Sequence, residues 1–283
     1  MGKISGYLRL MRSVNCVMMG CAVIVGAALS NPMGLGSSWL NLVYGFLTAF
    51  VLTAASMVVN DYYDQKADAI NEPTRPIPSG LIKPREALVF AAILVLVGLL
   101  AAYLTSFLCF LAAIVAWLVF VAYTTVGKRS GLPGNLLVSS CVAIPFIYGS
   151  VAMADTVKLN VLIFASIAFL SNTGREITKG IVDVQGDRTQ GVKTLAVRYG
   201  EKTAVSVAVL FYLSSVLMSP IPWFLGLVSS WFIPFVSVTD LGLALSSLML
   251  LRDHSRNNAR KIKRLVLLWF ITGLAAFVAG ASG

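Results

Sequence analysis

Long apolar stretches separated by short polar loops dominate this 283-residue sequence. Hydrophobic residues make up 58% of the chain and charged residues only 12%, whereas about a quarter of the residues in a typical soluble domain are charged. Several of the apolar stretches reach the roughly 20 residues that a helix needs to cross the hydrocarbon core of a bilayer. The sequence therefore predicts an all-α, polytopic membrane bundle, built as a single domain over residues 1–283.

Nine apolar stretches are expected to be transmembrane helices. Pro220, Pro222 and Pro234 interrupt the region between the seventh and eighth stretches, which predicts a broken outer loop or half-helix there. The nine predicted spans lie near residues 12–30, 39–61, 87–105, 107–124, 134–153, 159–180, 203–219, 231–251 and 263–281.

The positions of the basic residues support this count. All but one of the 22 Lys and Arg residues fall in the N-terminal tail or in alternate loops, and Lys158 is the exception. Because Lys and Arg collect in cytoplasmic loops, the N-terminus and these loops are expected to face the cytoplasm from the cell membrane. Topology and an anionic lipid leaflet then explain the net charge of +10, so the charge calls for no nucleic-acid partner. Nothing in the sequence indicates a protein partner.

Acidic residues collect at two points on this predicted cytoplasmic face. Seven of the twelve acidic residues lie in the stretches Asn60–Gly80 and Ser171–Gly200, each of which begins where an apolar stretch ends. In the first stretch, Asn60, Asp64 and Asp68 are four residues apart, so they share one face of a helix, with Asp61 at the edge of that face. The second stretch is expected to carry a similar face, made of Asn172, Glu176, Lys179, Asp183 and Asp187.

Carboxylates at this spacing repel one another unless a cation lies between them. Oxygen ligands without nearby His or Cys favour Mg²⁺, with Ca²⁺ or Mn²⁺ as weaker candidates. Proteins usually hold Mg²⁺ with a few carboxylates and with phosphate oxygens of the substrate, so the pattern predicts a phosphorylated substrate. One such stretch alone is equally typical of a solvated loop, but two with matching spacing on the same side favour a site.

The motifs in these two stretches resemble those of the UbiA superfamily of intramembrane prenyltransferases. NDYYDQKAD (Asn60–Asp68) matches the first motif of that family, N-D-x-x-D-x-x-x-D, and RPIPSG follows it at Arg75–Gly80. DVQGD (Asp183–Asp187) matches the second motif, an Asp pair four residues apart. The nine-span layout agrees with the family as well, so the resemblance covers essentially the whole chain.

Further residues favour one branch of the superfamily. RSVNCVMMG (Arg12–Gly20) and GREITKGIVDVQGD (Gly174–Asp187) look most like the archaeal digeranylgeranylglyceryl phosphate synthases, which add a second geranylgeranyl ether to a glycerol phosphate lipid. The 4-hydroxybenzoate branch usually carries an extra Asp just after its second motif, whereas Arg188 and Thr189 follow Asp187 here.

The resemblance implies a site with three sets of residues. The set implied to bind Mg²⁺ is Asn60, Asp61, Asp64, Asp68, Asp183 and Asp187, of which Asp61 is either a ligand or a supporting group. The catalytic set is Asp64, Asp68, Asp183, Asp187 and Tyr123, whose ring would steady an allylic cation. The set implied to bind the prenyl diphosphate and the glycerol-phosphate lipid is Arg12, Asn15, Arg75, Lys128, Arg129, Asn172, Arg175, Lys179 and Arg188.

Simpler explanations stand beside these roles. Positive-inside topology accounts for most single basic residues, and Tyr is common at membrane interfaces. Asn15 has the alternative of bridging two helices. Asp240 lies deep in the eighth predicted span, where it is either functional or a helix-packing partner, and the resemblance gives it no role.

Two other functions compete with ether-lipid synthesis. An aromatic or quinone prenyltransferase of the same superfamily would lack a phosphate site for its acceptor. A cation-coupled transporter would place its acids near the middle of the bilayer, whereas Asp240 alone is predicted to lie there.

Overall fold

The computed structural model describes residues 2–189 and 191–281, and all regular secondary structure in these two ranges is helical. The all-α prediction is therefore confirmed. The helices are α1 (Lys3–Met11), α2 (Ser13–Ser30), η1 (Pro32–Gly34), α3 (Trp39–Asn71), α4 (Pro84–Thr105), α5 (Phe107–Thr125), η2 (Gly127–Arg129), α6 (Leu132–Ala154), α7 (Leu159–Val182), α8 (Val184–Thr189), α9 (Leu195–Tyr199), α10 (Glu201–Met218), α11 (Ile221–Phe224), α12 (Phe232–Arg252) and α13 (Arg256–Ala281).

Eight helices in the described part of the chain are long and apolar enough to cross a membrane. They coincide with eight of the nine predicted spans. The remaining prediction falls on α7, which has 24 residues but carries polar side chains such as Asn172, Arg175 and Glu176 in its C-terminal half. These polar residues lower the mean hydropathy of α7, whose N-terminal half is apolar. The prediction that α7 crosses the membrane therefore stays a prediction.

The structure moves two of the predicted helix boundaries. Arg12 adopts a left-handed backbone conformation with φ 51° and ψ 60°, so it separates α1 from α2 where the sequence predicted the first span to begin. α3 continues to Asn71, ten residues beyond the predicted end of the second span at 61, so the whole first motif is helical, as its four-residue spacing predicted. The predicted break near the prolines is confirmed, because only the four-residue helix α11 forms there.

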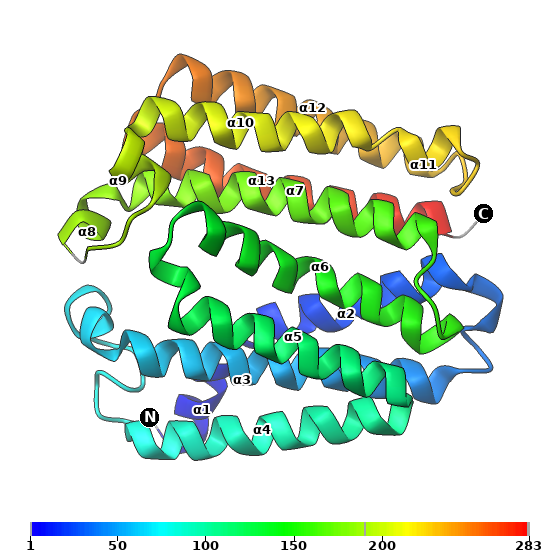
Figure 1. Cartoon of the computed structure of the whole chain (residues 1–283), viewed down its shortest axis with the longest axis horizontal. Helices are drawn as coiled ribbons and strands as arrows, with labels where there is room; N and C mark the ends of the chain where they lie inside the picture. Colours follow the sequence, from blue (N-terminus) through cyan, green and yellow to red (C-terminus); the bar gives the residue numbers. More distant parts are fainter. Residues whose placement is uncertain (1, 190, 282–283) are drawn as a thin grey trace.

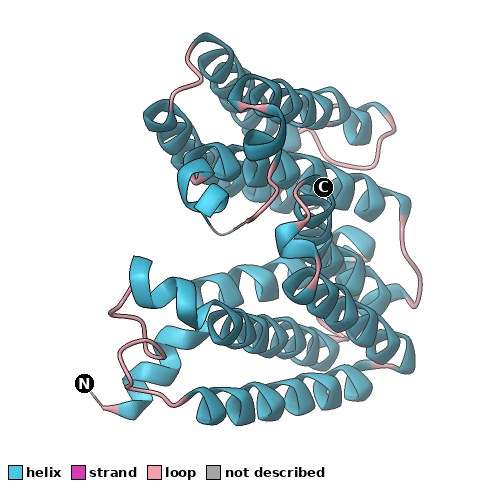
Figure 2. Ribbon diagram, turned by 60° about the vertical axis from the view of Figure 1, so that its left-hand side comes forward, coloured by secondary structure: helices cyan, strands magenta, loops and turns pink. Residues whose placement is uncertain are grey.

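The long helices form a bundle in which α2 and α6 occupy the middle (Figure 1). One side of the bundle consists of α3, α4 and α5, and the other consists of α7, α10, α12 and α13. The C-terminal end of α3 and the short helix α8 lie at the same end of the bundle in both views (Figures 1 and 2). The fold thus brings the chain segments with the two acidic motifs to one end.

α2 and α6 approach each other so closely that glycine is required at their crossing. A Cβ atom built at Gly149 would lie 2.0 Å from the carbonyl oxygen of Val23, and one at Gly26 would lie 2.1 Å from that of Phe146. Small residues allow backbones to approach in this way, and close packing of this kind drives association of helices in membranes.

Replacing Gly149 with alanine is expected to lower the free energy of unfolding by about 1–3 kcal/mol, because the added methyl group forces α2 and α6 apart. The measurement is the unfolding midpoint in detergent micelles. Gly273→Ala in α13 is the matched control, since its Cβ would meet only Thr239 at 3.5 Å, an ordinary contact. Equal midpoints for the two variants would contradict the tight crossing.

Candidate functional site

The acidic residues of the first motif lie in the last turns of α3, where basic side chains from other segments neutralise them. Asp61 is 3% exposed and accepts a hydrogen bond from Arg12 at 2.5 Å. Arg75 contacts Asp68 at 2.5 Å and Asp61 at 3.6 Å. One guanidinium therefore links two carboxylates that are seven residues apart.

Lys128 bridges the remaining two oxygen-bearing residues of this motif. Its ammonium group donates a hydrogen bond to Asn60 Oδ1 at 3.2 Å and another to Asp64 Oδ2. The prediction that residues four apart on this helix share a face is confirmed, because their oxygens converge on one positive charge. The charge that occupies this position in the structure is an ammonium from η2.

Local backbone geometry positions two of these basic side chains, Arg12 and Arg75, beside the C-terminal end of α3. Arg12 lies at the left-handed junction between α1 and α2, which turns the chain toward the end of α3. Arg75 lies in the turn that follows α3, where its amide donates to the Glu72 carbonyl at 3.0 Å and its carbonyl accepts from the Ser79 amide at 3.0 Å. Gly80 ends this turn with φ +75°, a conformation that glycine adopts without strain.

The second motif is not on one continuous helix, which corrects the prediction of a single face through Asp187. α7 ends at Val182, and Asp183 has φ −100° and ψ 6°, outside the helical range. The short helix α8 follows and carries Asp187. Gly180 and Gly186 flank the break. Because glycine lowers helix stability, interrupting the helix here loses little free energy.

Negative charge in the second motif is less completely neutralised than in the first. Within the described ranges, neither Asp183 nor Asp187 forms a salt bridge. Burial and, to a smaller extent, the neighbouring Asp183 carboxylate raise the pKa of Asp187 to about 6, although a hydrogen bond with Thr194 acts in the opposite direction. Asp183 also interacts electrostatically with Lys263 of α13.

Glu176 of α7 engages two of the predicted substrate-binding residues. It pairs with Arg175 Nη1 at 3.2 Å and with Lys179 Nζ at 2.7 Å. The Nε atom of Arg175 is buried without a hydrogen-bond partner in the described structure. Tyr123, on α5, interacts electrostatically with both Glu176 of α7 and Asp64 of the first motif.

Four of the predicted substrate-binding residues lie outside these ion pairs in the part of the chain that is described. Arg129 and Arg188 are exposed. The Asn172 amide donates to Ser139 Oγ at 3.1 Å in a buried contact, and the Asn15 amide contacts Met57 Sδ at 3.9 Å. For these four the structure gives neighbours but no test of a role in binding.

Lys263 is a residue of this region that the sequence did not single out. Its charge acts on Asp183, on Arg175 and Lys179 of α7, and on Arg260 of its own helix. In the sequence it is one of six basic residues between 252 and 264, all of which topology explains. No local spacing distinguishes it from its neighbours, because three of the four charges that act on it belong to residues 175–183.

The donor atoms at the two motifs suit a hard divalent cation, although they do not form a complete protein cage. In residues 2–189 and 191–281, no three His, Cys, Asp or Glu side chains are grouped closely enough to hold a metal ion. Asn60 and Asp64 nevertheless direct two oxygens at one cationic group, and Mg²⁺ typically takes one or two carboxylates and completes its coordination with phosphate and water.

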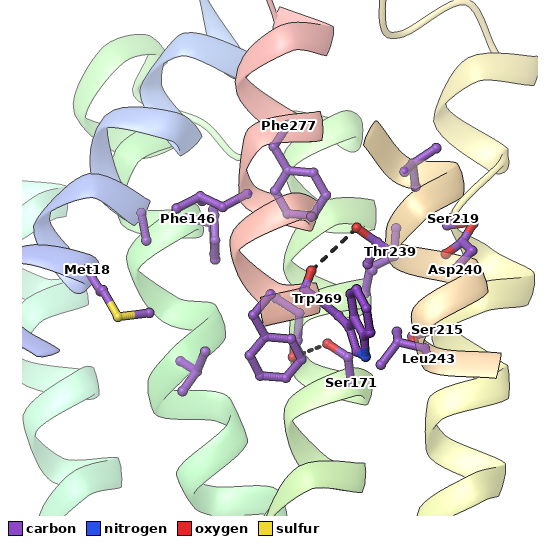
Figure 3. Close-up of a pocket in the computed structure, with 18 of the residues that line it drawn as sticks. Met18, Phe146, Ser171, Ser215, Ser219, Thr239, Asp240, Leu243, Trp269 and Phe277 are labelled. Carbon is purple, nitrogen blue, oxygen red and sulfur yellow. Dashed lines mark hydrogen bonds between the residues drawn. The ribbon is translucent and has the colours of Figure 1, made fainter. Parts of the chain in front are cut away.

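An apolar cavity lies deeper in the bundle, between α2, α6, α7, α10, α12 and α13 (Figure 3). Met18, Phe146, Trp269 and Phe277 contribute to its lining. Asp240 and Ser219 lie together on the side away from Met18, where Ser219 Oγ donates to Asp240 Oδ2 at 2.5 Å. This bond joins α12 to the end of α10, which supplies the helix-packing partner considered for Asp240.

Comparison with known proteins identifies the family. A model described as the UbiA prenyltransferase family matches residues 19–278. The chain belongs to the UbiA prenyltransferase family. Among the UbiA-related proteins, the digeranylgeranylglyceryl phosphate synthase of Archaeoglobus fulgidus is 37% identical over 276 residues, covering 96% of this chain and 94% of that protein. The enzyme of the same name from Methanosarcina mazei is 35% identical, with 97% of each chain covered.

Solved structures of UbiA-related proteins share the fold. One, described as giving structural and mechanistic insights into the biosynthesis of digeranylgeranylglyceryl phosphate synthase in membranes, is 30% identical and has a TM-score of 0.84, with 99% of each chain covered. A UbiA homologue from Archaeoglobus fulgidus bound to DMAPP and Mg²⁺ is 18% identical and has a TM-score of 0.72, covering 96% of this chain and 99% of that one. At that identity the second likeness concerns the fold alone.

Proposed function

We propose that this protein transfers a geranylgeranyl group from geranylgeranyl diphosphate to the free hydroxyl of 3-O-geranylgeranylglyceryl 1-phosphate, giving digeranylgeranylglyceryl phosphate. The observation that carries the proposal is the likeness to digeranylgeranylglyceryl phosphate synthases along nearly the whole chain. The two acidic motifs at one end of the bundle, each beside basic side chains, support it, because both proposed substrates carry phosphate groups.

The proposed reaction depends on Mg²⁺. Asn60, Asp64, Asp68, Asp183 and Asp187 would hold the ion. When bound, it supplies a Lewis acid that stabilises the negative charge developing on the departing diphosphate. Asp61 is buried between Arg12 and Arg75, so we assign it the role of orienting these two guanidinium groups.

The remaining residues would position the donor and protect the reacting carbon. Arg12, Arg75 and Lys128 carry positive charge at the first motif, where a diphosphate would exchange with the carboxylates that now hold them. The Tyr123 ring, which interacts electrostatically with Asp64 and Glu176, would stabilise the allylic cation. The apolar cavity would accommodate an isoprenoid chain and exclude the water that would otherwise capture that cation.

The proposed topology has nine spans in one transmembrane domain, with the N-terminus and the reacting groups on the cytoplasmic side. The distribution of basic residues supports it, because Lys158 alone among the 22 would then lie on the other face. The substrates would reach the site from the membrane, since both carry isoprenoid chains.

The purified protein with geranylgeranyl diphosphate and Mg²⁺ is expected to use the glycerol-phosphate lipid at least about 100-fold better, in kcat/KM, than an aromatic acceptor. The reason is that an acceptor without a phosphate would leave the charged groups of the acceptor site without a partner. Radiolabelled donor and separation of the lipid products provide the measurement. Preference for the aromatic acceptor would instead identify an aromatic or quinone prenyltransferase.

A further inference from the structure

A second group of basic side chains lies apart from those of the first motif. Arg175 and Lys179 from α7 and Arg260 from α13 each act electrostatically on Lys263 of α13. We call these four residues the α7–α13 cation cluster. Glu176 and Asp183 are the acids that the structure places against the cluster, so four positive charges meet two negative ones.

Core packing fixes this arrangement. Ile262 and Val266 of α13 are fully buried in the same hydrophobic cluster as Ile177 and Ile181 of α7. Lys263 follows Ile262 directly and is half-buried, whereas its neighbours Lys261 and Arg264 are exposed. Topology alone would require Lys263 only to face the cytoplasm, so its position against α7 needs a separate explanation.

Several donors of the cluster are available to a ligand. In the described part of the chain, Lys263 forms no salt bridge within 4 Å, and Arg175 Nε is buried without a partner. Partly buried like charges repel one another, and a buried donor without an acceptor is destabilising. An anion with several acceptor oxygens, such as a phosphate monoester, would offset the repulsion between the cations and accept the hydrogen bond that the buried donor lacks.

The first-motif cations already have partners of their own. Arg12, Arg75 and Lys128 each contact an acid of the first motif, on α3. Among the basic residues at this end of the bundle, one group therefore lies at each acidic motif. The proposed reaction likewise has two phosphate-bearing substrates, a diphosphate donor and a phosphate monoester acceptor.

We propose that Arg175, Lys179 and Lys263 form the subsite for the phosphate monoester of the acceptor lipid. The inference rests on the proposed function and adds Lys263, on α13, as a determinant of acceptor recognition. Lys263 and Arg175 would contact the phosphate directly. Glu176 would hold Arg175 and Lys179 in place, since it already pairs with both.

Lys263→Gln is expected to raise the KM for 3-O-geranylgeranylglyceryl 1-phosphate about 10- to 100-fold, which corresponds to the loss of one hydrogen bond to a charged group. The KM for geranylgeranyl diphosphate should stay unchanged. The dephosphorylated analogue, 3-O-geranylgeranylglycerol, should react equally with the variant and the unaltered protein. Equilibrium binding of the phosphorylated acceptor without donor should weaken by the same factor.

Two further variants separate this role from general effects of charge. Lys261→Gln removes an equal charge from an exposed position two residues away on α13 and should leave every parameter unchanged. Lys263→Arg keeps the charge and should recover most of the affinity. Unfolding midpoints of all variants report whether the fold is intact.

The outcomes distinguish the subsite from the reaction. An unchanged acceptor KM with a raised KM for geranylgeranyl diphosphate, or a changed Mg²⁺ requirement alone, would overturn the subsite and assign Lys263 to the donor or to Asp183. Absence of turnover by the unaltered protein with either acceptor would overturn the proposed function. In that case the binding measurement would still decide whether Lys263 recognises the phosphate.

Discussion

Replacing Asp64 with asparagine is expected to lower kcat/KM about 10³-fold. The amide lacks the anionic oxygen that would bind Mg²⁺, and the ion would in turn stabilise the negative charge on the departing diphosphate. Asparagine has the same shape and still accepts a hydrogen bond from Lys128, so the fold should persist. The measurement is turnover of geranylgeranyl diphosphate with saturating acceptor. Chelation of Mg²⁺ should abolish turnover in the unaltered protein, and added Mg²⁺ should restore it.

Glu72→Gln is the matched control for Asp64→Asn. Glu72 caps the C-terminus of the same helix and is exposed, so its charge should have little effect on turnover. Circular dichroism and unfolding midpoints should show both variants folded. Activity of Asp64→Asn close to that of Glu72→Gln, or turnover that persists after chelation, would overturn the proposed role of the first motif.

Replacing Arg75 with alanine is expected to lower the free energy of unfolding by about 3 kcal/mol. This value is the lower end of the range for breaking a buried ion pair, because the Arg75 side chain is itself 30% exposed. The change leaves Asp68 without its guanidinium and Asp61 with Arg12 alone. The unfolding midpoint in detergent micelles provides the measurement.

Arg85→Ala serves as the control for Arg75→Ala, since Arg85 is an exposed arginine near the start of α4. Adding Asp68→Asn to the Arg75→Ala variant should recover part of the lost stability, because it removes the carboxylate charge that Arg75 no longer compensates. Equal midpoints for Arg75→Ala and Arg85→Ala would show that the ion pairs in this turn contribute nothing to stability.

Much of the fold was predictable from the sequence because its rules are local. A stretch of apolar residues long enough to span a bilayer is helical, since a helix alone satisfies its own backbone hydrogen bonds in lipid. The helix ends were less predictable. α3 extends past the membrane-length segment because Asp64 and Asp68 are compatible with helix once their charges are paired. The partner of Asp68 is Arg75 in the turn after the helix, whereas the partner of Asp64 is Lys128, 64 positions away.

The candidate site divides in the same way. Four-residue spacing placed Asn60 and Asp64 on one face, and the structure confirms that their oxygens meet at one cation. For the second motif the same argument was wrong at its last turn, because the chain bends at Asp183. The prediction that one metal ion joins the two motifs has no test in the structure and is part of the proposed function.

The sequence by itself determined the membrane class, the helical architecture, the two acidic motifs and their collection at one end of the bundle. These follow from hydropathy, charge asymmetry and residue spacing, which act along the chain. Only the tertiary structure decided which cation pairs with which acid: Arg12 and Arg75 with Asp61, and Lys128 with Asp64. Partners that are 14 to 64 positions apart meet through helix packing, and the packing of buried faces leaves no local pattern in the charged residues themselves.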